Sequence, residues 1–219
     1  MKDKSQKRVE NIAKAYDSIE AAECYFSSGV NRLYDLQFKT VVSILKSLHI
    51  PNQGTKALDI GCSGGRYTNT LVSMGMDAIG IDTGIKPLIY ASKKLDASFI
   101  RANVIKLPFK EKRFGLILCI NLLHHFEDEA LEKVLEEISN VIKPGGIFIF
   151  DVKNKMNPIM WYKYKKEDSV EFTLKARTIR EMTKHIEKYG FEVIKKKGIL
   201  FPIALFAPFV VVFTRKDGI

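Results

Sequence analysis

The segment Leu58-Asp59-Ile60-Gly61-Cys62-Ser63-Gly64-Gly65-Arg66 decides the fold of this 219-residue chain. The apolar run 57–60 predicts a buried strand, and the amphipathic run 66–74 predicts a helix. The glycines between them let the backbone turn sharply and approach a ligand closely. Because the first N–H groups of a helix have no partner within it, they are available to a carboxylate or phosphate. The segment therefore predicts a strand, a binding loop and a helix in succession.

The same alternation continues along most of the chain. Strands that are apolar throughout are typical of a parallel sheet covered on both faces by helices. The last two predicted strands have no helix between them, so we expect them to pair antiparallel. Residues 9–48 show helical spacing with a break at 27–29. The predicted strands are 57–60, 78–82, 98–102, 114–120, 147–152, 191–196 and 209–214, and the predicted helices are 66–74, 85–95, 128–142 and 178–189.

Asp82 ends the second predicted strand. An acidic residue at this place can accept hydrogen bonds from both hydroxyls of a ribose. A dinucleotide fingerprint would need glycines at positions 61, 63 and 66, but the chain has Ser63 and Arg66 at the last two. A phosphate-binding loop of the Gly-Lys-Ser or Gly-Lys-Thr kind is also absent from the sequence. The pattern therefore favours a nucleotide-like ligand with no pyrophosphate on this loop.

Taken in order, these segments resemble the motifs of class I S-adenosylmethionine-dependent methyltransferases. The resemblance covers residues 55–216 and implies an α/β fold, with a Rossmann-like, seven-stranded, mostly parallel sheet, an antiparallel terminal hairpin and helices on both faces. It also implies an N-terminal helical lid at 1–54, a cofactor-binding core at 55–219 and a substrate-side insertion at 154–177. The segments that carry the resemblance are 58–65, 80–83, 100–109, 114–119 with 123–126, 141–146, 190–193 and 209–216.

The resemblance implies S-adenosylmethionine as cofactor and a role for each residue of its site. Asp82 and Thr83 would hold the ribose, and Asn103 with Val104 the adenine. Asp59 would orient the loop or receive the methionine ammonium through water. The other contacts would come from the backbone around the methionine and ribose, at Gly61, Cys62, Ser63, Gly65 and the carbonyl of Cys119.

Two positions depart from the family pattern. Ser63 replaces the middle glycine, which a small residue tolerates if its φ is negative. Asn103 replaces the aspartate that usually accepts a hydrogen bond from the adenine amino group. An amide oxygen can still accept that bond, without charge assistance. Both changes leave cofactor binding compatible with the sequence.

Methyl transfer is an in-line displacement whose leaving group is neutral, so the protein mainly aligns the nucleophile with the methyl group. A base is needed only if that nucleophile carries a proton of high pKa. His124 and His125 follow the fourth strand, and His124 is the candidate base. The alternative is that the pair packs and hydrogen-bonds within its loop. No metal is expected, because no nearby carboxylate or cysteine cluster completes a site.

Composition indicates a cytoplasmic protein. The three cysteines are far apart, which argues against a disulfide framework or a zinc site. The longest apolar run, 199–213, is shorter than the roughly 20 residues of a spanning helix and contains two prolines, so we expect no transmembrane segment. The net charge of +10 and the pI near 9.4 suit a lysine-rich solvated surface. The same charge can attract nucleic acid, anionic lipid or an acidic substrate.

The acceptor is indicated only by two segments. Residues 154–177 interleave methionine, tryptophan and tyrosine with lysines, which suits either stacked bases or the apolar wall of a small-molecule cavity. The apolar loop 199–208 favours a hydrophobic substrate, a homodimer contact or an approach to a membrane surface. We expect a small-molecule methyl acceptor, hydrophobic or aromatic as in quinone biosynthesis. The alternatives are an RNA methyltransferase and a non-catalytic cofactor-binding scaffold.

Overall fold

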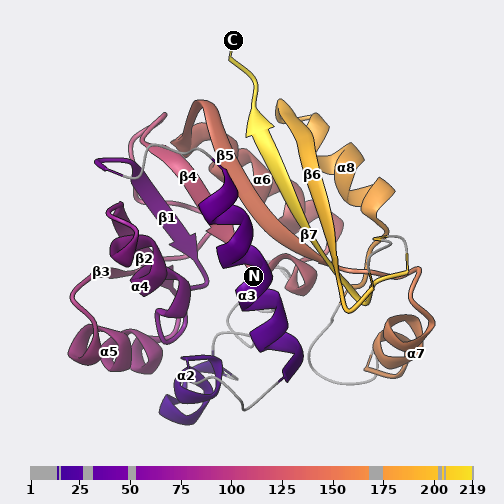
Figure 1. The fold of residues 1–219 in the computed structure, drawn as a ribbon, viewed down its shortest axis with the longest axis horizontal. Helices are drawn as coiled ribbons and strands as arrows, with labels where there is room; N and C mark the ends of the chain where they lie inside the picture. Colours follow the sequence, from indigo (N-terminus) through magenta and orange to yellow (C-terminus); the bar gives the residue numbers. More distant parts are fainter. Residues whose placement is uncertain are drawn as a thin grey trace, which may run out of the picture.

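Figure 1 shows the computed structural model of the chain, in which seven strands form a single sheet. The strand order is β3-β2-β1-β4-β5-β7-β6. Strands β1 to β5 run parallel, and β7 pairs antiparallel with both β5 and β6. The predicted α/β, Rossmann-like sheet with an antiparallel terminal hairpin is confirmed. The structure describes residues 14, 16–26, 32–48, 53–167, 175–201, 204 and 206–218. The strands are β1 (Lys56–Ile60), β2 (Asp77–Asp82), β3 (Ser98–Arg101), β4 (Phe114–Cys119), β5 (Ile142–Lys153), β6 (Phe191–Ile199) and β7 (Phe209–Lys216).

The strand order places a binding crevice beside β1. This strand pairs with β2 on one side and with β4 on the other, so the connections on its two sides lead away in opposite directions. In an open α/β sheet, ligands bind outside the carboxyl ends of the strands at such a reversal. The loop that begins at Gly61 and the residues after β4 therefore lie on either side of this point.

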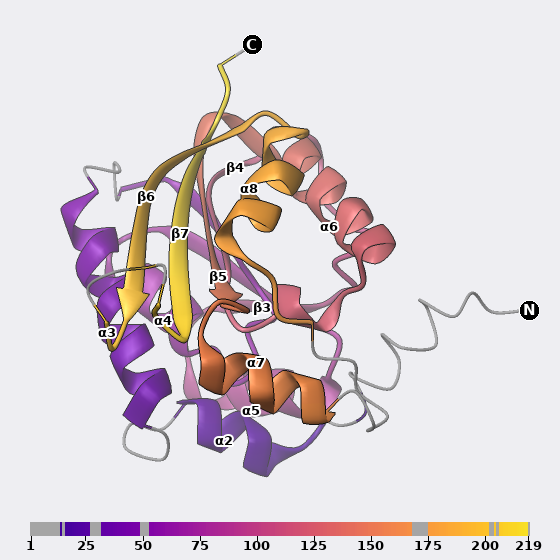
Figure 2. The ribbon, with the colours of Figure 1, turned by 90° about the vertical axis from the view of Figure 1, so that its right-hand side faces the viewer.

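Helices cover both faces of the sheet (Figure 2). Helices α3 and α4 contribute apolar side chains to the core of one face, and α6 and α8 contribute to the other. Among the described residues, no helix is long and apolar enough to cross a membrane. The helices are α2 (Ile19–Phe26), α3 (Arg32–Ser47), α4 (Arg66–Ser73), α5 (Ile85–Lys94), the 3-10 helix η1 (Leu123–His125), α6 (Asp128–Val141), α7 (Pro158–Glu167) and α8 (Ile179–Glu187).

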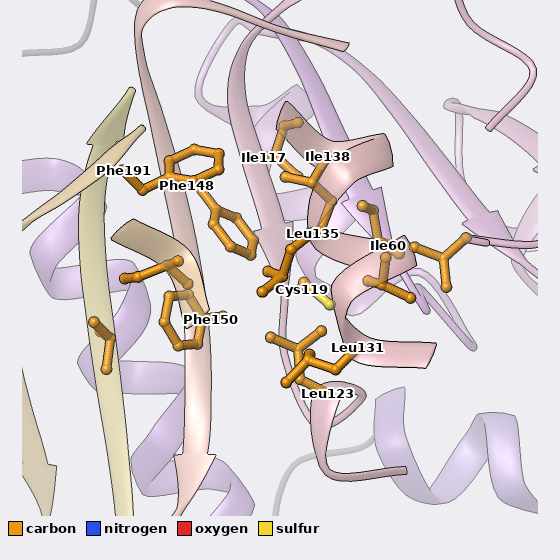
Figure 3. Close-up of a cluster of buried hydrophobic side chains, with 14 of the residues drawn as sticks. Ile60, Ile117, Cys119, Leu123, Leu131, Leu135, Ile138, Phe148, Phe150 and Phe191 are labelled. Atoms are coloured by element: carbon orange, nitrogen blue, oxygen red, sulfur yellow. The ribbon is translucent and has the colours of Figure 1, made fainter. Parts of the chain in front are cut away.

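The larger core lies beneath α6. Leu131, Leu135 and Ile138 recur at helical spacing and are fully buried, as the sequence pattern predicted. They pack in one cluster with Phe148 and Phe150 of β5 (Figure 3). Burying a large apolar side chain contributes roughly 1.5–3 kcal/mol, so the burial of these side chains stabilises the packing of α6 on the sheet.

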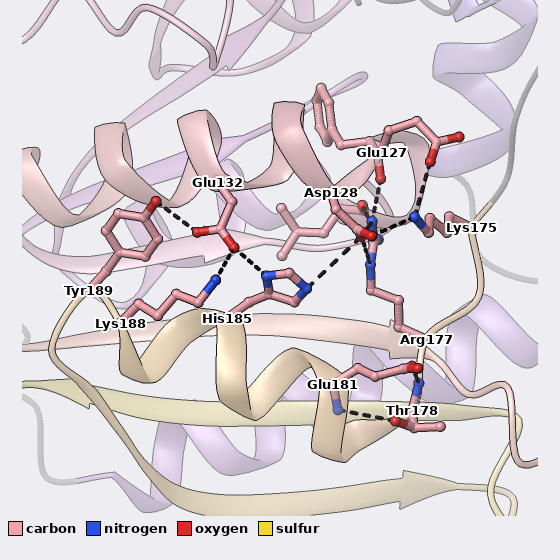
Figure 4. Close-up of polar contacts among 12 residues, drawn as sticks. Glu127, Asp128, Glu132, Lys175, Arg177, Thr178, Glu181, His185, Lys188 and Tyr189 are labelled. Atoms are coloured by element: carbon pink, nitrogen blue, oxygen red, sulfur yellow. Dashed lines mark hydrogen bonds and ion pairs between the residues drawn. The ribbon is translucent and has the colours of Figure 1, made fainter.

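Polar contacts fix α8 against α6 at the surface (Figure 4). The carboxylate of Glu132 accepts hydrogen bonds from the Lys188 ammonium at 2.7 Å and the Tyr189 hydroxyl at 2.8 Å, and it lies 2.6 Å from Nδ1 of His185. The Arg177 guanidinium donates to Asp128 at 2.8 Å. These contacts orient the end of the 154–177 segment relative to the core.

The elements differ most from the predicted ones in three places. Helix α6 ends at Val141, and β5 begins at Ile142, so the Pro-Gly-Gly turn 144–146 lies inside the strand span. Strand β6 continues to Ile199 because its pairing with β7 persists to Phe209. The segment 154–177 contains α7, which the sequence pattern did not predict. Its mixture of aromatics and lysines has no clear amphipathic period, and that is why no helix was expected.

The N-terminal segment 1–54, which was expected to form a lid, also contributes side chains to the core. Val41, Ile44 and Leu45 of α3 are buried in the cluster on one face of the sheet. The predicted helices are present as α2 and α3, while the predicted break at 27–29 lies outside the described residues. The division into a lid at 1–54 and a core at 55–219 stays a prediction.

Candidate functional site

The loop after β1 has three residues with positive φ. Gly61 has φ 72°, Ser63 46° and Gly65 80°. The amides of Gly61 and Cys62 both donate to the carbonyl of Ile81, at 2.8 and 3.0 Å, which ties the loop to β2. Ser63 therefore does not have the negative φ that was expected of a residue in place of the middle glycine, and that expectation is wrong. A non-glycine residue in this region costs of order 1–3 kcal/mol and persists only where its surroundings hold it.

Asp82 helps to keep Ser63 in this conformation. Its carboxylate accepts hydrogen bonds from the backbone N–H of Ser63 at 3.0 Å and of Gly84 at 2.9 Å. Burial raises the pKa of Asp82, and these two bonds oppose the rise. A carboxylate has about four acceptor positions, so it can accept further hydrogen bonds from a ligand. Asp82 is thus both the clamp of the loop and an acceptor at the crevice.

Asp59 lies beneath the loop rather than in the crevice. It is buried and accepts a hydrogen bond from the Thr68 hydroxyl of α4 at 2.6 Å. Burial raises the pKa of Asp59 to about 6. The bond joins the end of β1 to the first turns of the helix after the loop. Of the two roles predicted for Asp59, this geometry suits orientation of the loop.

Two adjoining cavities lie at the carboxyl ends of β1, β2 and β4. The larger has an open volume of about 900 Å³ and the smaller about 430 Å³. Both are bounded by Gly61, Asp82, Thr83 and Leu122, so they form one crevice that passes Asp82. The rest of the larger cavity is lined by Tyr16, Tyr34, Gln37, Phe38, Cys62, Ser63, Arg66, Tyr67, Pro87, Ile120, Asn121 and His125. The rest of the smaller cavity is lined by Ile60, Ile81, Ala102, Asn103, Val104 and Phe126.

Most of the predicted cofactor residues meet at this crevice. Gly61, Cys62, Ser63, Asp82 and Thr83 line the larger cavity, and Asn103 and Val104 line the smaller one. The side-chain oxygen of Asn103 accepts from the backbone N–H of Ile105 at 3.0 Å, so it also shapes its own turn.

Three predicted residues stand back from the cavity walls. Asp59 is buried below the loop, and Cys119 is fully buried in the core, with the cavity lining beginning one residue later at Ile120. Gly65 is buried where a Cβ would come within 2.8 Å of side-chain atoms of Leu95 and Phe99. Its absence of a side chain therefore permits packing of the loop against the neighbouring elements.

The histidine at the cavity is His125, not the predicted His124. His125 is buried, lines the larger cavity, and its ring lies 5.6 Å from that of Tyr16 in an edge-to-face arrangement. Burial and the nearby Lys153 ammonium lower the pKa of His125 to about 4. The Nδ1 atom of His125 has no hydrogen-bond partner among the described residues. The 3-10 turn of η1 decides which of the two adjacent rings faces the cavity, and periodicity could not predict that turn.

A buried polar cluster beside the cavity was missed by the sequence analysis. Asp151 accepts from the Lys153 ammonium at 2.7 Å and from the backbone N–H of Asn121 at 2.5 Å. Lys153 also donates to the side-chain oxygen of Asn121, whose φ is 59°. The amide of Asn121 donates to Gln37 of α3 at 3.0 Å. The sequence feature that could have indicated this cluster is the pair of charged residues Asp151 and Lys153 at the end of an otherwise apolar strand.

Helix α3 closes one wall of the cavity through these contacts and one ion pair. The Arg66 guanidinium at the start of α4 donates to Asp35 of α3 at 2.8 Å and lies 3.9 Å from the centre of the Phe38 ring. Gln37 is fully buried, and its Nε2 atom has no hydrogen-bond partner among the described residues. A buried, unpaired amide donor costs about 1–3 kcal/mol, so this side of the cavity suits a ligand with an oxygen acceptor. Within the described ranges, no group of three or more histidine, cysteine or acidic side chains could hold a metal ion.

Comparisons with known proteins agree with this geometry. Residues 58–150 match a family described as a methyltransferase domain. A ubiquinone biosynthesis O-methyltransferase of Colwellia psychrerythraea is 32% identical over 104 residues, which are 45% of this chain and 42% of that protein. An uncharacterized protein of Methanocaldococcus jannaschii is 28% identical over 200 residues, covering 90% of this chain and 82% of that protein. The chain spans about half the length of the ubiquinone-biosynthesis relatives that it matches.

Solved structures show the same fold. The magnesium protoporphyrin IX methyltransferase of Synechocystis PCC 6803, crystallised with bound SAH, superposes with a TM-score of 0.77 at 15% identity, covering 95% of this chain and 99% of that chain. The chain thus has the fold of this solved methyltransferase, and its residues 58–150 match a methyltransferase domain. The matched domain and the shared fold agree with the resemblance that the sequence motifs indicated.

Proposed function

We propose that this chain binds S-adenosylmethionine in the crevice and transfers its methyl group to a small, apolar or aromatic acceptor in the larger cavity. The observation that carries the proposal is the position of Asp82, which borders both cavities and accepts a hydrogen bond from Ser63 in the loop after β1. A fixed carboxylate at this place suits the paired hydroxyls of a ribose.

The residues present fit this cofactor. The smaller cavity has apolar walls at Ile81, Val104 and Phe126 for the adenine, with Asn103 at its edge. The loop residues and the unpaired amide of Gln37 border the larger cavity, where they would hold the methionine portion. When bound, the cofactor would supply a methyl group on a sulfonium, whose neutral leaving group needs no proton.

The acceptor side is mostly apolar and aromatic. Tyr34, Phe38, Tyr67 and Ile120 provide rings and an aliphatic surface around the larger cavity. His125 is uncharged near neutral pH, because its pKa is about 4. A neutral imidazole would accept a hydrogen bond from a hydroxyl group and orient its oxygen. Protonation of the imidazole would be opposed by the positive charge of Lys153. Together these features support an aromatic hydroxyl compound as the acceptor.

Cofactor binding can be tested without knowing the acceptor. We expect Asp82→Ala to raise the dissociation constant for S-adenosylmethionine at least tenfold, about 1.4 kcal/mol, in isothermal titration calorimetry. Asp77→Ala is a matched control, because Asp77 begins the same strand and its side chain is exposed. Asp82→Asn, which keeps one acceptor oxygen, should lie between the two. Equal affinity of all three variants would refute the ribose assignment.

Methyl transfer is tested with labelled cofactor and fractions of a cell extract. Label in the small-molecule fraction, reduced in a His125→Ala variant that still binds cofactor, is the expected result. Label in RNA would replace the small-molecule proposal with the RNA alternative. Binding of cofactor with no label in any fraction would indicate the non-catalytic scaffold.

A further inference from the structure

A group of apolar side chains is exposed beside the crevice, on α7 and on the turn between β6 and β7. They include Ile159, whose exposed fraction is 72%, Trp161 at 47% and Phe201 at 49%. We call the whole set the apolar rim. It consists of Met156, Ile159, Trp161, Tyr162, Leu200, Phe201 and Phe206.

Hydrogen bonds hold the two halves of the apolar rim together. The side-chain amide of Asn157, at the start of α7, donates to the carbonyl of Phe206 at 2.8 Å. The amide of Asn154 donates to the carbonyl of Ala207 at 2.9 Å. Met160 of α7 is buried in the same cluster as Ile199 and Phe209, the two ends of the turn. The rim is therefore one surface built from two segments about 40 residues apart in the chain.

The rim lies at the same edge of the sheet as the crevice. Strands β5 and β6 both run antiparallel to β7, so the end of β5, the end of β6 and the start of β7 share one edge. Strands β1 and β4 run parallel to β5 and end there too. Figure 1 shows α7 and the β6–β7 turn at this edge, and Figure 2 shows them close together. The Lys153 ammonium beside the cavity lies 3.8 Å from the centre of the Phe209 ring.

Positive charge borders the rim. Lys195, Lys196 and Lys197 are exposed on β6 immediately before the turn, and Lys155 is exposed before α7. The whole chain has a net charge of +10. Tryptophan and tyrosine with lysines behind them are the side chains favoured at the boundary between lipid headgroups and acyl chains. Lysines close to that boundary are attracted by anionic headgroups.

We propose that the apolar rim docks on an anionic phospholipid surface, with Ile159, Trp161 and Phe201 entering the interfacial layer and Lys195 to Lys197 contacting the headgroups. Docking in this way would bring the edge of the sheet that carries the crevice towards the lipid. The inference depends on the composition of the rim and not on methyl transfer, so it can fail or succeed independently of the proposed function.

The single tryptophan of the chain reports on this directly, because Trp161 lies in the rim. We expect vesicles of phosphatidylcholine and phosphatidylserine to shift its fluorescence emission to shorter wavelength, and vesicles of phosphatidylcholine alone to do so far less. Ile159→Ser with Phe201→Ser should lower the vesicle partition coefficient at least about tenfold. Ile89→Ser is the control, because Ile89 is also exposed, at 45%, but lies on α5, outside the rim. Far-ultraviolet circular dichroism should show all variants folded.

The charge contribution has its own control. Replacing Lys195, Lys196 and Lys197 by glutamine should weaken binding and flatten its dependence on salt. The same replacement of Lys110, Lys112 and Lys143, which are exposed at the opposite edge of the sheet, should change binding little. Equal losses in the two triple variants would overturn the proposal.

Other occupants of the rim would give different results. An emission shift with an RNA oligonucleotide but not with anionic vesicles would overturn the proposal in favour of nucleic acid. A shift that grows with protein concentration in the absence of vesicles, with a matching rise in sedimentation coefficient, would overturn it in favour of a second copy of the chain. No shift under any of these conditions would also overturn it.

Discussion

Removing one member of the buried Asp151–Lys153 pair tests how the polar cluster beside the cavity is held. Both side chains are nearly inaccessible, at 0% and 2% exposure, and the carboxylate and ammonium are 2.7 Å apart. Asp151→Asn would leave the Lys153 ammonium in the interior without its carboxylate partner. Breaking a buried pair in this way typically costs about 3–5 kcal/mol.

The effects of replacing Asp151 and Lys153 on the free energy of unfolding should be non-additive. In the double variant Asp151→Asn, Lys153→Met no charge remains, so we expect a loss of only about 1–2 kcal/mol, because replacement of a whole buried pair is often near neutral. Urea-induced unfolding followed by circular dichroism gives both values. The single variant should also lower Tm by roughly 6–20 °C for a protein of this size.

The exposed pair between Lys56 and Asp77 is the matched control. Its nitrogen and oxygen are 2.8 Å apart, close to the distance in the buried pair, but the side chains are 41% and 56% exposed. Asp77→Asn should therefore cost less than about 1 kcal/mol. If Asp151→Asn costs no more than Asp77→Asn, or if the double variant loses the sum of the two single losses, the reasoning from burial is refuted.

Two further predictions concern Ser63 in the loop after β1 and Glu132, whose contacts join α6 to α8. Ser63→Gly should raise the free energy of unfolding by about 1 kcal/mol in urea titrations, because glycine adopts a φ of 46° without strain; a decrease would show that the serine is not strained there. Burial opposes ionisation of Glu132, but hydrogen bonds from Lys188, His185 and Tyr189 outweigh it and lower the pKa to about 2. Since the folded pKa lies below the unfolded value, this contribution is complete above about pH 4.5 and is lost as the pH falls towards 2. Because Glu132 is partly exposed, its contribution to the free energy of unfolding is limited to about 1 kcal/mol or less. The Glu132→Gln variant should therefore be less stable than the parent at pH 7 but not near pH 2.

Much of the fold followed from local patterns. The apolar runs, the helical spacing of Leu131, Leu135 and Ile138, and the absence of a helix between the last two strands predicted the sheet and its antiparallel end, because burial on one or both faces dictates those periodicities. The first loop, with Asp82 at the end of the next strand, predicted the crevice in the same way. These features depend on residues that are close in sequence.

Tertiary structure decided what distant residues do together. The positive φ of Ser63 depends on the carboxylate of Asp82, and the 3-10 turn of η1 places His125 rather than His124 at the cavity. The cluster of Gln37, Asn121, Asp151 and Lys153 joins a helix, a loop and a strand that come together only when the sheet forms. Local sequence specifies which face of a strand or helix is apolar, but the partner of a buried polar group is set by packing between elements. For that reason the positions of Gln37, Asn121 and His125 at the cavity could be assigned only from the folded chain.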